Sequence, residues 1–186
     1  MVNGLALMPE HDILQAAWIV TLPDHEATER FAGVLAEELK AGDLVTLSGG
    51  LGAGKTTLAR ALVRTLAGDP ELEVPSPTFT LMQVYDGRRS PIVHADFYRL
   101  SGGYELVELG WDEMTENAIA LVEWPERAED ALRPEHLDIR LDFAPGEGGR
   151  GRIAMLTGTG AFVSRLQRMK AYRNLVERCG WSDTGR

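Results

Sequence analysis

Cysteine and long apolar runs are nearly absent from this sequence, and each shortage excludes a class of protein. The 186 residues include one cysteine, Cys179, which cannot form a disulfide within the chain and fits a reducing cytoplasm. No run approaches the roughly 18 consecutive apolar residues that a membrane-spanning helix requires. The first residues also lack the basic leader and apolar core of an export signal. We therefore expect a cytoplasmic protein with no contact to a membrane.

Histidine is scarce as well, and positive charge gathers at one end of the chain. The four histidines show no ligand spacing, so no histidine/cysteine metal site is predicted: His11, His25, His94 and His136. The net charge is −9, yet residues 161–186 carry six basic and two acidic side chains, which leaves about −13 for the first 160 residues. Such an acidic body disfavours a broad nucleic-acid surface. The basic end fits contact with RNA or an acidic partner, and it fits a solvated helix face equally well.

Apolar residues alternate between strand and helix spacing, which is typical of one α/β domain. We expect strands over residues 18–22, 44–47, 79–85, 92–95, 119–122, 136–143 and 152–156. Helices are expected from Pro23-Asp24 to Gly42, from residue 55 to Gly68, in part of 101–118, and over 161–178. Asp86-Gly87 signals an antiparallel hairpin, so the predicted sheet is mixed, mostly parallel and flanked by helices. The expected divisions are an N-terminal extension (1–16), one small domain (17–160) and a basic C-terminal helix or tail (161–186).

The strongest motif runs from Gly49 to Thr56 and matches the G-x-x-x-x-G-K-[ST] phosphate loop in full. Its glycines let the backbone N–H groups surround a phosphate, and the following helix directs the positive end of its dipole there. Lys55 is expected to contact the terminal phosphate oxygens, and the Thr56 hydroxyl to ligate Mg²⁺. The predicted contacts of the loop with the nucleotide are Gly49, Gly50, Leu51, Gly52, Ala53, Gly54, Lys55, Thr56 and Thr57.

Two expected strands end in a carboxylate. Asp96 follows Ile92 to Ala95, and Glu123 follows Ile119 to Val122. The carboxyl ends of buried strands are where an α/β sheet collects its chemistry, so both are predicted catalytic residues and metal ligands. The sequence does not rank them, and each alone would also fit a surface position at a strand end.

A third candidate is Ser76-Pro77-Thr78. Pro75 and Pro77 restrict the backbone around Ser76 to extended forms, which makes a stiff arm bearing two hydroxyl groups. Such an arm suits a nucleotide switch that senses the terminal phosphate. A proline-rich loop before a strand is an equally good interpretation.

Taken together, these motifs are similar to one family. EAT at 26–28, GLGAGKTT, SPTFTL, HADFYRL, ELVELG at 105–110 and VEWPER occur in order. In this combination the chain resembles, from about residue 17 to 156, the TsaE (YjeE) family. These proteins are the ATPase subunit of the bacterial machinery that makes N6-threonylcarbamoyladenosine at position 37 of tRNA.

The resemblance implies a small P-loop domain that binds ATP and Mg²⁺ and works with TsaB and TsaD. TsaD transfers the threonylcarbamoyl group, ATP hydrolysis resets the complex between turnovers, and tRNA is reached only through the complex. By position, Thr56 and Glu123 would lie at magnesium, with Asp96 as the other acidic group of the site. The resemblance adds two nucleotide contacts, Trp124 beside the nucleotide and Thr28 from the first helix. For Trp124, core packing of a large ring is an equal alternative.

One residue departs from the family pattern, and two other functions remain open. Gly50 stands where the family usually carries an acidic residue. A small-molecule kinase would need an arginine-rich lid, for which only Arg150 and Arg152 are available. A non-catalytic nucleotide switch is the other alternative. A guanine-specific switch is disfavoured because the chain has no N-K-x-D segment.

Overall fold

The computed structural model describes residues 18–145 and 151–171. Seven strands and the main helices alternate along the chain. The strands are β1 (Trp18–Leu22), β2 (Leu44–Ser48), β3 (Met82–Tyr85), β4 (Ile92–Asp96), β5 (Ile119–Glu123), β6 (Leu137–Phe143) and β7 (Arg152–Gly158). The helices are α2 (His25–Glu38), α3 (Lys55–Ala67), α4 (Tyr104–Glu108), α5 (Trp111–Thr115) and α6 (Ala161–Ala171), with 3₁₀ turns η2 (Pro125–Arg127) and η3 (Glu129–Ala131).

All seven strands form one mixed sheet in the order β1-β7-β6-β2-β5-β4-β3. The central strands β6, β2, β5 and β4 are parallel, while β7, β1 and β3 run antiparallel to their neighbours. Parallel neighbours need crossover connections, and here helices supply most of them. The predicted α/β fold with a mostly parallel central sheet and an antiparallel hairpin is confirmed.

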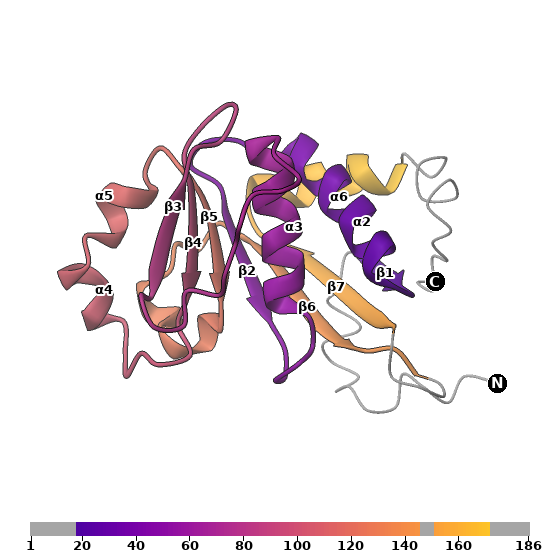
Figure 1. The fold of residues 1–186 in the computed structure, drawn as a ribbon. Coiled ribbons are helices and arrows are strands. Elements are labelled where there is room, and N and C mark those ends of the chain that lie inside the picture. The colour runs from indigo at the N-terminus through magenta and orange to yellow at the C-terminus, as the bar shows by residue number, and fades with distance from the viewer. Residues whose placement is uncertain (1–17, 146–150, 172–186) are drawn as a thin grey trace.

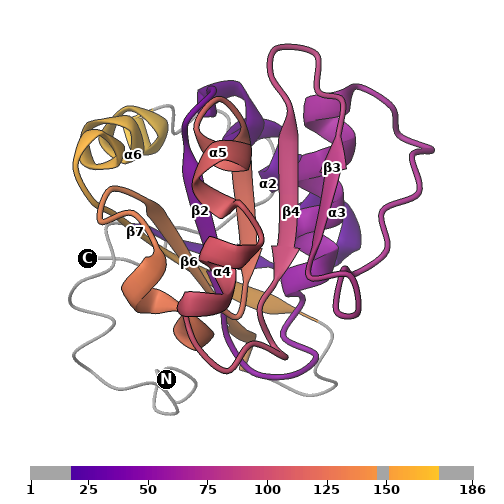
Figure 2. The same cartoon turned by 90° about the vertical axis from the view of Figure 1, so that its left-hand side faces the viewer.

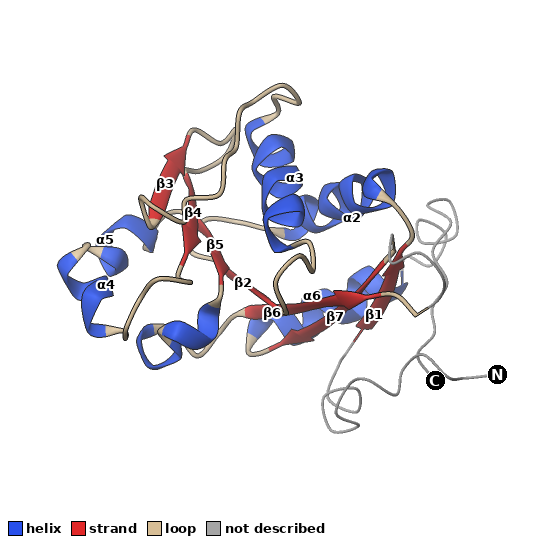
Figure 3. Cartoon of the chain, turned by 60° about the horizontal axis from the view of Figure 1, so that its bottom comes forward, coloured by secondary structure: helices blue, strands red, loops and turns tan. Residues whose placement is uncertain are grey.

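Helices cover both faces of this sheet, as Figure 1 shows with α4 and α5 on one side and α2 and α3 on the other. The larger core lies under α2 and α3 and takes alternate residues of the strands, for example Val45 and Leu47 of β2. The second core lies under α4 and α5 and takes the intervening residues, such as Val93 and Ala95. Figure 2 views the molecule from the α4 and α5 side, and Figure 3 separates helices from strands by colour. No helix within the described residues is long and apolar enough to cross a bilayer.

Local signals set most helix ends. The Asp24 side chain accepts a hydrogen bond from the Ala27 N–H at 2.8 Å and caps α2. Gly68, at φ +70°, ends α3 as the sequence predicts. The prediction that Gly42 ends the first helix is wrong, because α2 stops at Glu38. Gly42 instead takes its positive φ in the turn before β2, where its N–H bonds to the distant Ala118 carbonyl.

The hairpin of β3 and β4 is shorter and its connection longer than the sequence suggests. The strand expected over 79–85 begins only at Met82, since Leu81 takes a φ of +64° and its N–H bonds to the Pro77 carbonyl. Asp86-Gly87 forms no two-residue turn, and residues 86–91 join the strands. The cause is tertiary, because the Arg88 N–H donates to the Leu66 carbonyl and holds this loop against the end of α3.

The closing helix α6 is tied to the α2–β2 connection. Arg165, which is buried, donates to the Asp43 carboxylate, while a second Asp43 contact is the Lys40 N–H. The predicted helix 161–178 is described as far as Ala171. The expected N-terminal extension, Arg150, Cys179 and the end of the basic segment lie outside the described residues.

Candidate functional site

Three parallel strands end side by side and bring the candidate carboxylates to the glycine loop. In the register of the sheet, Glu123 at the end of β5 lies beside Leu47 of β2 and beside Asp96 of β4. Since β2 leads directly into Gly49, the loop begins next to both acids. Both carboxylates are on the α3 face of the sheet, because Asp96 and Glu123 alternate with Ala95 and Val122 of the opposite core.

The loop backbone has the curled form that phosphate binding requires. Gly49 and Gly54 have φ values of +126° and +106°, a region that side-chain-bearing residues rarely adopt. A Cβ on Gly49 would lie 2.2 Å from the Leu141 carbonyl oxygen, so no other residue fits there. Gly54 begins α3, and the free N–H groups of that helix end therefore face the loop. In contrast, a Cβ on Gly50 would meet nothing within 4 Å, so its glycine is not required by space.

The Lys55 ammonium lies folded over its own loop. It donates to the carbonyl oxygens of Gly49 at 2.7 Å and Gly50 at 2.9 Å. It also lies 3.6 Å from the centre of the Trp124 ring, at the distance of a cation–π contact. Burial lowers the pKa of Lys55, and the negative charge of Glu123 opposes this shift. These contacts keep the cation beside the loop.

Glu123 is buried and has a hydrogen-bond partner on each carboxylate oxygen. The Thr56 hydroxyl donates to Oε2 at 2.7 Å. The Nε2 of His94 lies 2.9 Å from Oε1, and both side chains are almost completely inaccessible to solvent. Thr56 and Glu123 thus place a hydroxyl and a carboxylate together at the start of α3.

Asp96 fastens the serine–threonine arm to the sheet. Its Oδ2 lies 2.8 Å from the Ser76 hydroxyl and 2.7 Å from the Thr78 hydroxyl, and these two hydroxyls are themselves 2.7 Å apart. The other oxygen of Asp96 accepts the Tyr98 N–H at 3.0 Å. The two hydroxyls have two protons for three short contacts, so an ionised Asp96 leaves one oxygen pair with no proton between them.

Two adjoining cavities flank the loop, and together they collect most of the predicted site residues. The first has a volume of about 360 Å³. Its lining includes Leu51, Gly52, Gly54, Lys55, Thr56, Thr57, Ser76, Thr78, Asp96, Tyr98, Glu123 and Trp124. The second, of about 180 Å³, is lined by Thr28 and Ala53 and shares Gly54 and Thr57 with the first. Thr28 therefore lies next to the loop, and its contact with a nucleotide stays a prediction.

Arg152 clamps the outer side of the loop. Its Nε donates to the Ala53 carbonyl and one terminal nitrogen to the Gly52 carbonyl, both at 3.0 Å. The guanidinium group also lies 4.3 Å from the centre of the Phe143 ring. These contacts direct Arg152 at the backbone of the loop, which is not the position of a lid over an acceptor substrate.

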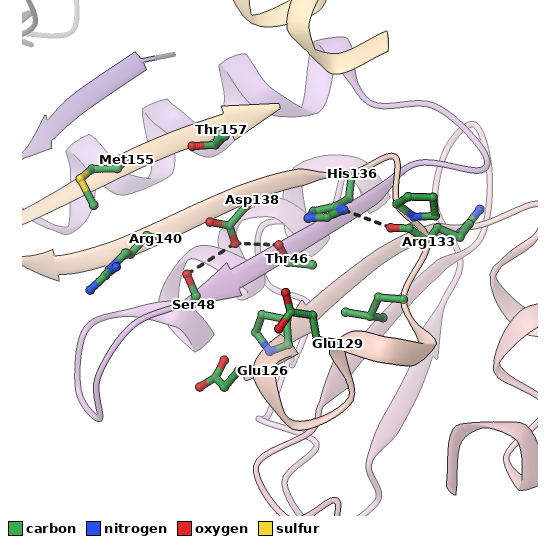
Figure 4. Close-up of a pocket in the computed structure, with 13 residues that line it drawn as sticks. Thr46, Ser48, Glu126, Glu129, Arg133, His136, Asp138, Arg140, Met155 and Thr157 are labelled. Carbon is green, nitrogen blue, oxygen red and sulfur yellow. Dashed lines mark hydrogen bonds between the residues drawn. The ribbon is translucent and has the colours of Figure 1, made fainter. Parts of the chain in front are cut away.

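A larger cavity, of about 570 Å³, lies on the opposite face of the sheet (Figure 4). Thr46 of β2 and Asp138 of β6 point into it, and the Thr46 hydroxyl donates to Asp138 at 2.8 Å. Burial raises the pKa of Asp138, against the opposing effect of the hydrogen bond from Thr46. Because Lys55, Thr56 and both strand-end acids face the other side, size alone does not make this cavity the nucleotide site.

Three residues of the site were not assigned these contacts from the sequence: His94, Arg152 and Tyr98. A signal existed for His94, since it stands two positions before Asp96 in HADFYRL and alternate strand residues share a face, whereas Tyr98 follows the end of β4 and had no such signal. The Tyr98 ring contacts Trp124 at a tilt of 55°, with ring centres 5.0 Å apart. Arg152 is distant from the loop in sequence, so its contact depends on the pairing of β6 with β7 and was not visible in any local pattern.

The family model described as "Threonylcarbamoyl adenosine biosynthesis protein TsaE" matches residues 22–150. A Streptomyces coelicolor protein named tRNA threonylcarbamoyladenosine biosynthesis protein TsaE is 43% identical over 130 residues, covering 68% of this chain and 86% of its own. A Rickettsia conorii protein of the same name is 38% identical over 122 residues, which cover 66% and 69%. The crystal structure of YdiB from Bacillus subtilis superposes with a TM-score of 0.68 at 30% identity, covering 83% of this chain and 95% of that one.

Proposed function

Because this chain belongs to the TsaE family, we propose that it is the ATP-hydrolysing subunit of a tRNA threonylcarbamoyladenosine synthesis complex. In this proposal it binds ATP with Mg²⁺, works with TsaB and TsaD, and reaches tRNA only through that complex. Its ATPase activity is weak alone, is stimulated by these partners, and resets the complex between turnovers.

The observation that carries the proposal is the hydrogen bond between Thr56 and Glu123 beside a complete glycine loop. Hydroxyl and carboxylate oxygens are the ligands that Mg²⁺ prefers, and a nucleotide-bound Mg²⁺ takes its remaining ligands from phosphates and water. No three His, Cys, Asp or Glu side chains gather as a metal site within the described part of the chain. Bound beside Thr56 and Glu123, Mg²⁺ would neutralise charge on the phosphates.

Lys55 would exchange its two carbonyl partners for phosphate oxygens. In the present contacts its charge is shared between Gly49 and Gly50, whose carbonyls are neutral acceptors. An anionic phosphate oxygen adds an attraction between opposite charges that a neutral carbonyl lacks, so it would compete well for this ammonium. The stacked ring of Trp124 would keep water away from the same side of the cation.

Asp96, Ser76 and Thr78 would form the sensor of the terminal phosphate. Oδ2 of Asp96 and the two hydroxyl oxygens lie within 2.8 Å of one another, so a phosphate or cation that binds one of them would change the contacts of the other two. In this proposal Asp96 is a catalytic residue and, through water or directly, a second metal ligand. Movement of the arm would report ATP to the partner proteins.

The alternatives have less support. A kinase would need a mobile basic lid, whereas Arg152 is committed to the Gly52 and Ala53 carbonyls. A non-catalytic switch would use the same loop but would not need Glu123 in contact with Thr56. Measuring ATP turnover therefore separates the non-catalytic switch from the proposed ATPase.

The test measures ATP hydrolysis by the purified chain alone and with TsaB and TsaD added. We expect low activity alone, stimulation by the partners, and no phosphorylated small-molecule product. Lys55→Ala and Glu123→Ala should abolish turnover with the fold intact, whereas Glu108→Ala, which removes an exposed acid on α4, should leave basal activity unchanged. Absence of both complex formation and ATP turnover in the wild type would refute the proposal. Full activity in Glu123→Ala would transfer the metal role to Asp96.

A further inference from the structure

His94 is a fully buried imidazole whose one hydrogen-bonding partner is a carboxylate of the candidate site. It projects from the middle of β4 toward α3, with an exposed fraction of 0%. Its Nε2 lies 2.9 Å from Oε1 of Glu123 on the neighbouring strand. Its Nδ1 has no hydrogen-bond partner among the described residues.

The contact with His94 gives the two carboxylate oxygens of Glu123 different partners. In the tautomer that carries its proton on Nε2, His94 donates this proton to Oε1 of Glu123. His94 therefore contacts Oε1, while Oε2 faces the Thr56 hydroxyl. A carboxylate held at one oxygen by a neighbouring strand and at the other by a helix has a fixed plane.

Packing alone does not explain an imidazole at this position. Asp96 and Glu123 end this side of β4 and β5, and the residues before them on the same side, Ile92, Ile119 and Leu121, belong to the apolar core. Burying a polar ring among them costs free energy unless it gains a hydrogen bond, and a leucine-sized side chain would fill the space without that cost. The hydrogen bond that offsets this cost for His94 comes from Glu123. This partner indicates that His94 has a role in the candidate site.

We propose that His94 is a positioning residue that holds Glu123 with Oε2 directed to the Thr56 side. This inference rests on the proposed function, because it assigns Glu123 to the cation that accompanies the nucleotide. The geometry resembles the way residues outside a metal's own ligand set orient its ligands, where loss of one partner typically weakens metal binding about 10- to 100-fold. His94 itself touches neither nucleotide nor cation and acts through Glu123 alone.

The experiment compares two substitutions of His94 whose side-chain amides extend to different distances from Cβ. In His94→Gln the side-chain amide nitrogen stands the same number of bonds from Cβ as Nε2, so it can still donate to Oε1. In His94→Asn the amide is one bond shorter and falls short. Ile92→Val, two residues earlier on the same face of β4, is the matched control for a change in core packing.

Two binding constants are measured for each variant in the full chain. One is the affinity of Mn²⁺ for the ADP-bound protein, by electron paramagnetic resonance. The other is the affinity of ADP in the presence of a chelator, where no divalent cation contributes. We expect His94→Asn to weaken Mn²⁺ binding about 10-fold or more, while its affinity for ADP in the presence of the chelator is unchanged. Both affinities of His94→Gln should stay close to wild type. His94→Met, which fills the space without a donor, is tested beside them and should match His94→Asn.

The outcomes separate this inference from the proposed function. If the wild type binds neither ADP nor Mn²⁺, the proposed function itself fails. If the wild type binds both but His94→Asn and His94→Met bind Mn²⁺ normally, only the role of His94 is refuted. Equal losses in the Gln and Asn variants, or a matching loss of ADP affinity in chelator, would show a general packing effect and would also overturn the inference.

Discussion

Replacing Gly49 with alanine should destabilise the protein, while the same change at the adjacent Gly50 should not. The two positions differ in backbone conformation and in their surroundings. At Gly49 the backbone has a φ of +126° and the new Cβ would lie 2.2 Å from the Leu141 carbonyl oxygen. At Gly50 no positive φ is present and the new Cβ meets nothing within 4 Å.

The expected loss of stability in Gly49→Ala combines two costs, that of the left-handed backbone and that of the steric contact. A left-handed backbone costs a residue with a Cβ about 1–2 kcal/mol, and overpacking against a fixed backbone costs about 1–3 kcal/mol. We therefore expect Gly49→Ala to lose about 3 kcal/mol, which lowers the melting temperature by roughly 6–12 °C for a chain of this size. Gly50→Ala should gain about 0.4–1 kcal/mol, because alanine restricts the unfolded chain.

Urea denaturation followed by intrinsic fluorescence and by far-ultraviolet circular dichroism measures both free energies of unfolding. The four tryptophans provide the fluorescence signal. The reasoning would be refuted if the two variants were equally stable, or if Gly49→Ala matched the wild type. Such a result would mean that the loop relaxes away from Leu141 at no cost.

Three further predictions concern charged residues. Burial raises the pKa of Asp138 above 3.8, so its ionisation opposes folding, and stability should fall as pH rises through that raised pKa. Asp138→Asn should remove this decline, giving a higher melting temperature at pH 7 and no advantage below pH 3.8. Arg152→Lys, which cannot donate to two loop carbonyls at once, should weaken nucleotide binding by about 1–3 kcal/mol in calorimetric titration. Asp96→Ala removes the acceptor of Ser76 and Thr78 and should cost about 1–3 kcal/mol of stability in urea, with faster proteolysis of the arm.

Much of the fold was predictable because its signals are local. Short apolar runs set the strands of the parallel centre, and Gly68 ended α3 where it was expected. The predictions that failed were those in which distant contacts override a local signal. Gly42 looked like a helix end but serves a turn that bonds to Ala118, and Asp86-Gly87 looked like a tight turn but belongs to a loop held by Leu66.

By itself, the sequence determined the chemistry of the site: a complete phosphate loop, two acids at strand ends and an arm with two hydroxyls. These depend on residue types at fixed spacing along a short stretch, which is information that a linear pattern contains. Only the tertiary structure decided which groups meet, because strand order and register are set by the packing of the whole sheet. That packing joined Thr56 to Glu123, Asp96 to the arm, Arg152 to the loop, and His94 to the carboxylate it faces.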